Sequence, residues 1–90
     1  MALAPAHPNP LNPRTIIPFR LDAERFVHLA VHDLRGRRVR SLVDGRVAAG
    51  DHRVAWDGRD DGAAEVASGV YVVRLEAAGQ VESRRVLVLK

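Results

Sequence analysis

The stretch FVHLAVHDLRGRRV, residues 26–39, decides the class of fold. Its apolar residues Val27, Leu29 and Val31 alternate with other residues at the period of a β-strand that has one buried face. Gly36 follows at a position where a tight hairpin requires a positive φ, and the next segment, RRVRSLV, again reads as a strand. The stretch therefore predicts two antiparallel strands joined by a short turn.

Similar patterns continue along the rest of the chain. Further strands are predicted over residues 15–21, 52–56, 70–77 and 83–90. Pro18 cannot donate to a ladder, so the first of them is expected at a sheet edge. The pair Asp44-Gly45 is expected to turn the chain, and residues 77–82 are expected to form a hairpin. Roughly six or seven short strands with no helical period predict an all-β fold, either a β-sandwich or a small closed barrel.

The inward faces of these strands supply candidate core residues. Trp56 and Tyr71 are the only Trp and Tyr of the chain, and both are expected to reach the core on either side of one loop. The predicted structural anchors are Phe19, Leu29, Val31, Gly36, Val54, Trp56, Gly69, Tyr71 and Leu75.

Length and proline content divide the chain into one domain and an N-terminal segment. A chain of 90 residues suffices for a single domain. Four of the five prolines lie among the first 13 residues, and proline fixes φ and removes a backbone donor. Residues 1–13 are therefore predicted to be a linker or an extended arm, and residues 14–90 to form the β-sandwich domain.

Composition argues against several classes of function. The net charge is +3, but the arginines are spread among acidic residues and aromatic residues make up only 4% of the chain, so no nucleic-acid partner is expected. The absence of cysteine excludes thiol chemistry. No apolar run approaches the ~18 residues of a membrane helix. The N-terminus lacks the features of a signal peptide, so an export signal is not expected within these residues.

The loop WDGRDDGAAEVASGVY, residues 56–71, raises the question of a metal site. Asp57 and Asp61 fit part of a calcium-loop pattern, and Asp60 lies between them. However, Arg59 stands at the third position of that pattern, and Ser68 stands where a bidentate Glu is needed. Asp and Gly also reverse loops between strands. The aspartates are therefore predicted to shape a turn, with calcium binding by Asp57, Asp60 and Asp61 as the alternative.

Other catalytic or metal-binding arrangements are incomplete. His28 and His32 share a strand face, but four residues of strand separate them by about 13 Å, too far to hold one zinc ion. None of the three serines lies in a nucleophile-elbow motif. No glycine-rich loop precedes a helix, as phosphate binding would require. We therefore expect a non-catalytic domain that uses no cofactor.

Several motifs in order resemble one bacterial family. NPLNPRTIIPFRL is similar to the N-P-F-N-P-S-T-x-I-x-F opening of C-terminal sorting domains of the type IX secretion system, and equally to FlgD-type immunoglobulin-like domains. VHLAVHDLRGRRV, LVDGRVAAGDHRVAWDGRD and VASGVYVVRLEAAG resemble the family's following segments. The sequence departs from the family pattern at Leu11, which replaces an aromatic residue, at Arg14, at Pro18 and at His32, which replaces Tyr.

The resemblance implies an immunoglobulin-like antiparallel β-sandwich of about seven strands at the end of a larger exported protein. Such a domain acts as a sorting signal that the outer-membrane secretion machinery recognises, so that the parent protein is delivered to the cell surface. The FlgD-type relatives imply the alternative of a structural or adhesive scaffold or spacer, whose partners are neighbouring domains of the parent protein. A third hypothesis is a metal- or sugar-binding accessory module that uses the aspartates of the loop.

The last predicted strand, SRRVLVLK, is the candidate for recognition by a partner. If it lies at a sheet edge, its unpaired backbone groups can extend the sheet of another protein. The alternative is that it only completes the sandwich. The candidate recognition strand comprises Val86, Leu87, Val88, Leu89 and Lys90.

Overall fold

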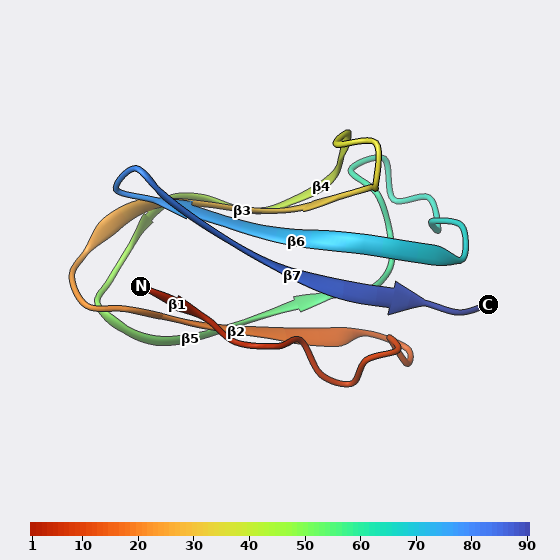
Figure 1. The fold of residues 1–90 in the computed structure, drawn as a ribbon, viewed down its shortest axis with the longest axis horizontal. Coiled ribbons are helices and arrows are strands. Elements are labelled where there is room, and N and C mark those ends of the chain that lie inside the picture. The colour runs from red at the N-terminus through yellow and green to blue at the C-terminus, as the bar shows by residue number, and fades with distance from the viewer.

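The computed structural model describes residues 1–90 and contains seven strands and no helix. The strands are β1 (Ala2–Leu3), β2 (Thr15–Leu21), β3 (Arg25–His32), β4 (Arg38–Val47), β5 (Gly50–Trp56), β6 (Gly69–Ala77) and β7 (Gln80–Val88). They form a three-stranded sheet in the order β1-β2-β5 and a four-stranded sheet in the order β4-β3-β6-β7. Figure 1 shows the two sheets as separate layers. The predicted all-β, antiparallel β-sandwich is confirmed, and the closed barrel is excluded.

The core lies between the two sheets and follows the predicted alternation. In β3, Val27, Leu29 and Val31 have no exposed surface, whereas Phe26 on the opposite face is 59% exposed. A single cluster joins residues from both sheets: Leu3, Ala6, Ile17, Phe19, Leu21, Val27, Leu29, Val31, Trp56, Tyr71, Val73, Leu75, Ala77, Val86 and Val88. Burial of these side chains is the main force that holds the layers together.

Two tight turns form as predicted. Between β3 and β4, Gly36 adopts φ +83° and its N–H donates to the carbonyl of Asp33 at 3.0 Å. The Asp33 carboxylate accepts hydrogen bonds from the N–H groups of Arg35 and Arg37. Between β6 and β7, Ala78 and Gly79 both have positive φ, the conformation of a two-residue hairpin turn.

The position of Pro18 differs from the prediction, because β2 is the central strand of its sheet. Ala4 N–H donates to the Pro18 carbonyl at 3.0 Å, so the donor that proline lacks faces the segment containing β1. The chain continues past this position and pairs again at His7, which exchanges two hydrogen bonds with Ile16. The arm pairs in register with β2 only on either side of this position, so the ladder does not require the N–H that Pro18 lacks.

The predicted turn at Asp44-Gly45 is also wrong. Both residues lie inside β4, where Asp44 pairs with His28 and Gly45 with Val27. The ladder with β3 continues as far as Arg25, which keeps β4 extended through these turn-forming residues. The chain reverses instead between Val47 and Gly50.

The first 13 residues run along the sandwich and connect its two sheets. Leu3 and Ala6 are 1% and 4% exposed and belong to the core. Leu3 also contacts β7, because its N–H donates to Glu82 Oε1 at 2.7 Å and its carbonyl accepts from Arg84 Nε at 2.9 Å. The arm therefore contributes a strand to one sheet and side-chain contacts to the edge of the other.

Candidate functional site

Two aromatic side chains hold the acidic loop against the core. Trp56 is 1% exposed, and its ring meets that of Tyr71 edge-on, with centroids 5.6 Å apart. Trp56 Nε1 donates to the carbonyl of Arg59 at 2.9 Å, and the Tyr71 hydroxyl donates to the carbonyl of Ala67 at 2.6 Å. Burial, together with the nearby charge of Asp33, raises the pKa of Tyr71. Both ends of the loop are thus anchored by a hydrogen bond from a core side chain.

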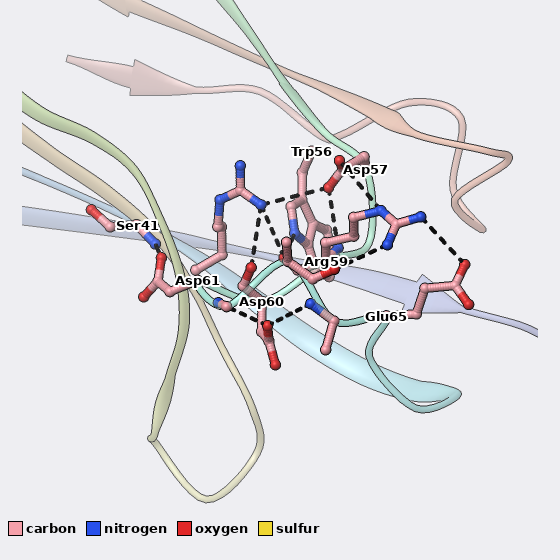
Figure 2. A network of polar contacts seen from close by, with 11 residues as sticks. Ser41, Trp56, Asp57, Arg59, Asp60, Asp61 and Glu65 are labelled. Atoms are coloured by element: carbon pink, nitrogen blue, oxygen red, sulfur yellow. Dashed lines mark hydrogen bonds and ion pairs between the residues drawn. The ribbon is translucent and has the colours of Figure 1, made fainter.

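Each aspartate of the loop accepts hydrogen bonds from backbone N–H groups (Figure 2). Asp57 Oδ1 accepts from Arg59 N–H at 3.1 Å. Asp60 Oδ1 accepts from Gly62 N–H at 2.9 Å and from Ala64 N–H at 3.0 Å. These contacts are local turn-forming bonds.

Asp61 links the loop to the edge of β4. Its N–H donates to the Val39 carbonyl at 2.9 Å, and its Oδ1 accepts from Ser41 N–H at 2.9 Å. Its Oδ2 lies 3.3 Å from Arg38 Nε. The loop therefore occupies backbone groups that an edge strand would otherwise leave open.

Guanidinium groups lie beside the carboxylates of Asp57 and Asp61, two of the three candidate calcium ligands. Arg40 Nη1 lies 3.7 Å from Asp57 Oδ1 and also donates to the carbonyls of Arg59 and Asp60. Arg59 Nε lies 3.9 Å from Asp57 Oδ2. No group of three or more His, Asp or Glu side chains converges as metal ligands do. A calcium ion here would compete with two arginines for the oxygens of Asp57.

The histidines of β3 lie on the outer face of the larger sheet. His28 is opposite Glu76 and His32 is opposite Val72 in the β3–β6 ladder. Burial lowers the pKa of His32 below 6.5, with a further contribution from the charge of Arg74. Its Nδ1 is buried without a hydrogen-bond partner. This environment favours a neutral imidazole.

The candidate recognition strand is partly core and partly surface. β7 is an edge strand of the larger sheet, but Val86 and Val88 are 0% and 1% exposed. Leu87 is half-buried, whereas Leu89 is 62% exposed and Lys90 is also exposed. Lys90 N–H donates to Ser68 Oγ at 2.9 Å, which ties the end of the chain to the acidic loop.

The arm covers the edge of β7 beside Leu87. Asn9 Oδ1 accepts from Leu87 N–H at 2.9 Å, and Leu11 N–H donates to the Leu87 carbonyl at 2.9 Å. Asn9 Nδ2 also donates to the Arg85 carbonyl at 3.2 Å. The sequence analysis did not identify Asn9 or Leu11 as contacts of β7. The edge groups of Leu87 are therefore not free for a partner while the arm is in place.

The predicted anchors occupy different environments. Phe19, Leu29, Val31, Trp56, Tyr71 and Leu75 are buried core residues. Val54 is only half-buried and packs against the core from β5. Gly36 lies in the β3–β4 turn, and Gly69 is the first residue of β6. Neither glycine belongs to the buried core.

A model of the FlgD Ig-like domain family matches residues 18–80, well over half of the chain. The chain belongs to this family. The match confirms the resemblance drawn from the sequence. It includes both aromatic anchors and the acidic loop, whereas the arm and all of β7 after Gln80 lie outside it.

Among solved structures, this FlgD Ig-like domain is similar to PorZ, described as an essential bacterial surface component of the type-IX secretion system of Porphyromonas gingivalis. The TM-score is 0.67 and the sequence identity is 22%, a likeness that shows the fold. The match covers 98% of this chain and 11% of PorZ, so the chain spans only a small part of that protein. A comparison with curated proteins gave no match. The structure contains no helix that could span a membrane.

Proposed function

We propose that this FlgD Ig-like domain is a non-catalytic C-terminal sorting or anchoring module that directs a larger exported protein through the type IX secretion pathway to the cell surface. The observation that carries the proposal is its family together with its fold likeness to PorZ. The structural match covers 98% of this chain and 11% of PorZ, a surface component of that system. A domain of this kind therefore occurs as a small part of a much larger protein at that surface.

The distribution of polar groups supports a role in protein recognition. In the acidic loop, the carboxylates and arginines bind one another and the backbone, which favours a structural role for the loop. In β7 and the residues after it, Arg85 and Leu89 are exposed, and Arg85 has no carboxylate partner. Partners of the module would be proteins of the outer-membrane secretion machinery.

The second candidate function is a structural spacer or adhesive domain in an extracellular assembly. Figure 1 places the two termini toward opposite ends of the long axis of the sandwich, which extends 38 Å. A domain with this arrangement separates the segments that precede and follow it. In this alternative, the partners are neighbouring domains of the parent protein.

The sorting proposal is tested by fusing residues 1–90 to the C-terminus of a periplasmic reporter in a bacterium that has type IX secretion. The arm is kept because Leu3 and Ala6 are core residues. A matched control carries Trp56→Ala together with Leu29→Ala, because losing two buried core side chains at once is expected to unfold the domain, and a second control carries an unrelated immunoglobulin-like domain.

We expect the fusion to appear at the cell surface or in the medium, and both controls to remain in the periplasm. A reporter that stays in the periplasm while the fused domain is folded contradicts the sorting function and favours the spacer. Delivery that does not depend on the type IX system contradicts the proposed pathway.

A further inference from the structure

We propose that the open edge of β7, residues Val81–Arg85, binds an extended segment of a partner protein as an added β-strand. In this complex an apolar side chain of the segment occupies a hollow beside Val81, and an acidic side chain faces Arg85. The inference deepens the proposed function by defining the chemistry of the partner, and its biological setting rests on that function.

The backbone of β7 leaves hydrogen-bonding groups free at this edge. In an antiparallel ladder, successive residues direct their N–H and C=O groups to opposite sides of the strand. Leu87 directs both groups to the arm, on the side away from β6, so Arg85, Ser83 and Val81 face the same side. The Arg85 carbonyl is bound by Asn9, but the N–H of Arg85 and both backbone groups of Ser83 and Val81 have no partner.

The arm already shows that the backbone groups of this edge can bind another segment of chain. Asn9 and Leu11 bind Leu87 through one side-chain and one backbone hydrogen bond. The open positions continue the same edge toward the β6–β7 turn. Val81, Ser83 and Arg85 are all exposed, so an incoming strand reaches them without displacing the core.

A hollow next to the open edge provides a pocket for one side chain. It has a volume of about 370 Å³ and lies on the outer face of the larger sheet. Its apolar lining is Leu34, Val72 and Val81, of which Leu34 and Val81 are 67% and 52% exposed. Ser83 and Arg74 complete the side nearest the edge. In strand addition, backbone bonds give affinity and pockets for alternate side chains give specificity.

Charge defines the second feature of the partner. Arg85 is exposed and has no carboxylate partner, whereas Arg74 is paired with Glu76 at 2.8 Å. In the β7 register, Arg85 and Ser83 point to the same face of the sheet, two residues apart. The chemistry that fits is therefore an extended peptide with an apolar residue near Ser83 and an acidic residue two positions away.

The other strand edges are less suited to this role. The edge of β4 is occupied at Val39 and Ser41 by Asp61. β1 is only two residues long. The rest of the β4 edge and the outer edge of β5 remain available, and the experiment must distinguish both from β7.

The test is a titration of the ¹⁵N-labelled 90-residue chain, followed by NMR. The probes are two blocked seven-residue peptides of threonines with a central leucine and a glutamate two residues before or after it, one for each strand direction. A third peptide carries lysine in place of glutamate. We expect saturable chemical-shift changes for one glutamate peptide at Val81–Arg85 and around Leu34 and Val72.

Three variants separate the contributions to binding. Ser83→Pro removes a free N–H at an edge position, where proline is compatible with a strand, and we expect at least about tenfold weaker binding. Ser83→Ala is the matched control and should bind as the parent does. Arg85→Glu should weaken binding of the glutamate peptide about two- to fivefold and favour the lysine peptide instead.

The proposal is overturned if neither glutamate peptide gives saturable changes at millimolar concentration, if the changes map to β4 or β5, or if Ser83→Pro binds as tightly as Ser83→Ala. Its failure is distinct from that of the sorting function. If the domain binds the peptide but leaves the reporter in the periplasm, the docking edge is supported and the sorting role is refuted. If the domain binds neither peptide but still delivers the reporter to the surface, and Ser83→Pro does not change that delivery, the docking edge is refuted and the sorting role is retained.

Discussion

Replacing Trp56 with Ala tests the interpretation of the acidic loop as a corner held from inside. The indole is 1% exposed, meets the ring of Tyr71, and donates to the Arg59 carbonyl. The substitution removes all three contributions at once. It leaves a cavity at the end of β5, and the loop loses one of its two anchors.

The expected cost follows from these contacts. Truncation of a buried Trp to Ala costs about 3–5 kcal/mol. We expect the upper part of this range, about 4–5 kcal/mol, because the Arg59 carbonyl also loses its closest donor. A domain of this size is stable by about 5–13 kcal/mol, so much of that stability would be lost.

Urea unfolding measures this cost directly. Far-UV circular dichroism is the appropriate signal, since the variant lacks the only Trp of the chain. Val54→Ala is the matched control, because Val54 is half-buried on the same strand, and it should cost only about 1 kcal/mol. A loss below about 2 kcal/mol for Trp56→Ala would refute the reasoning that the indole anchors the corner.

Three further outcomes are expected. Asn9→Ala should lower the free energy of unfolding by about 1–2 kcal/mol, because it removes two hydrogen bonds to β7. The control Asn12→Ala should change it by less than about 0.5 kcal/mol in the same urea assay. Equal effects of the two substitutions would contradict the contacts between the arm and β7. Burial holds the pKa of His32 below 6.5 in the folded domain, so the unfolded chain binds a proton at a higher pH than the folded one. The free energy of unfolding should therefore decrease as the pH falls below about 6.5. His32→Gln should reduce this slope in melting experiments between about pH 7.5 and about pH 5, and an unchanged slope would assign it to other groups. Gly36→Ala should cost about 1 kcal/mol because φ is +83°, whereas Gly45→Ala should cost nothing, and thermal melting that shows equal shifts would be inconsistent with the turn geometry.

The strands and the core were predictable because their signal is local. Alternation in β3 identifies Val27, Leu29 and Val31 as a buried face without any knowledge of the partner strands. The turn at Gly36 was predictable for the same reason, because a positive φ restricts the residue type.

Strand order and edge contacts were not predictable from local patterns. Pro18 indicated an edge, but β2 is central because a two-residue strand from the arm pairs beside it. Asp44-Gly45 indicated a turn, but pairing with β3 continues through both residues. The pairing of strands distant in sequence determines the environment of Pro18 and the strand conformation of Asp44-Gly45. The conformational propensities of single residues do not predict such pairing.

The candidate interaction surface shows the same division. The sequence identified the last strand as a candidate edge, and β7 is one. It did not show that Asn9 and Leu11 cover Leu87, because those contacts join segments more than 70 residues apart. The open part of the edge consequently lies at Val81–Arg85, earlier in the strand than the predicted recognition residues.

The fraction of reporter protein that added protease can reach on intact cells tests the central claim most directly. With residues 1–90 fused to its C-terminus, we predict that most of the reporter is cleaved in a host with type IX secretion, and that the reporter stays protected in a mutant of that host without the pathway. A folded fusion that is protected in both hosts would contradict the claim that this domain directs its parent protein to the cell surface.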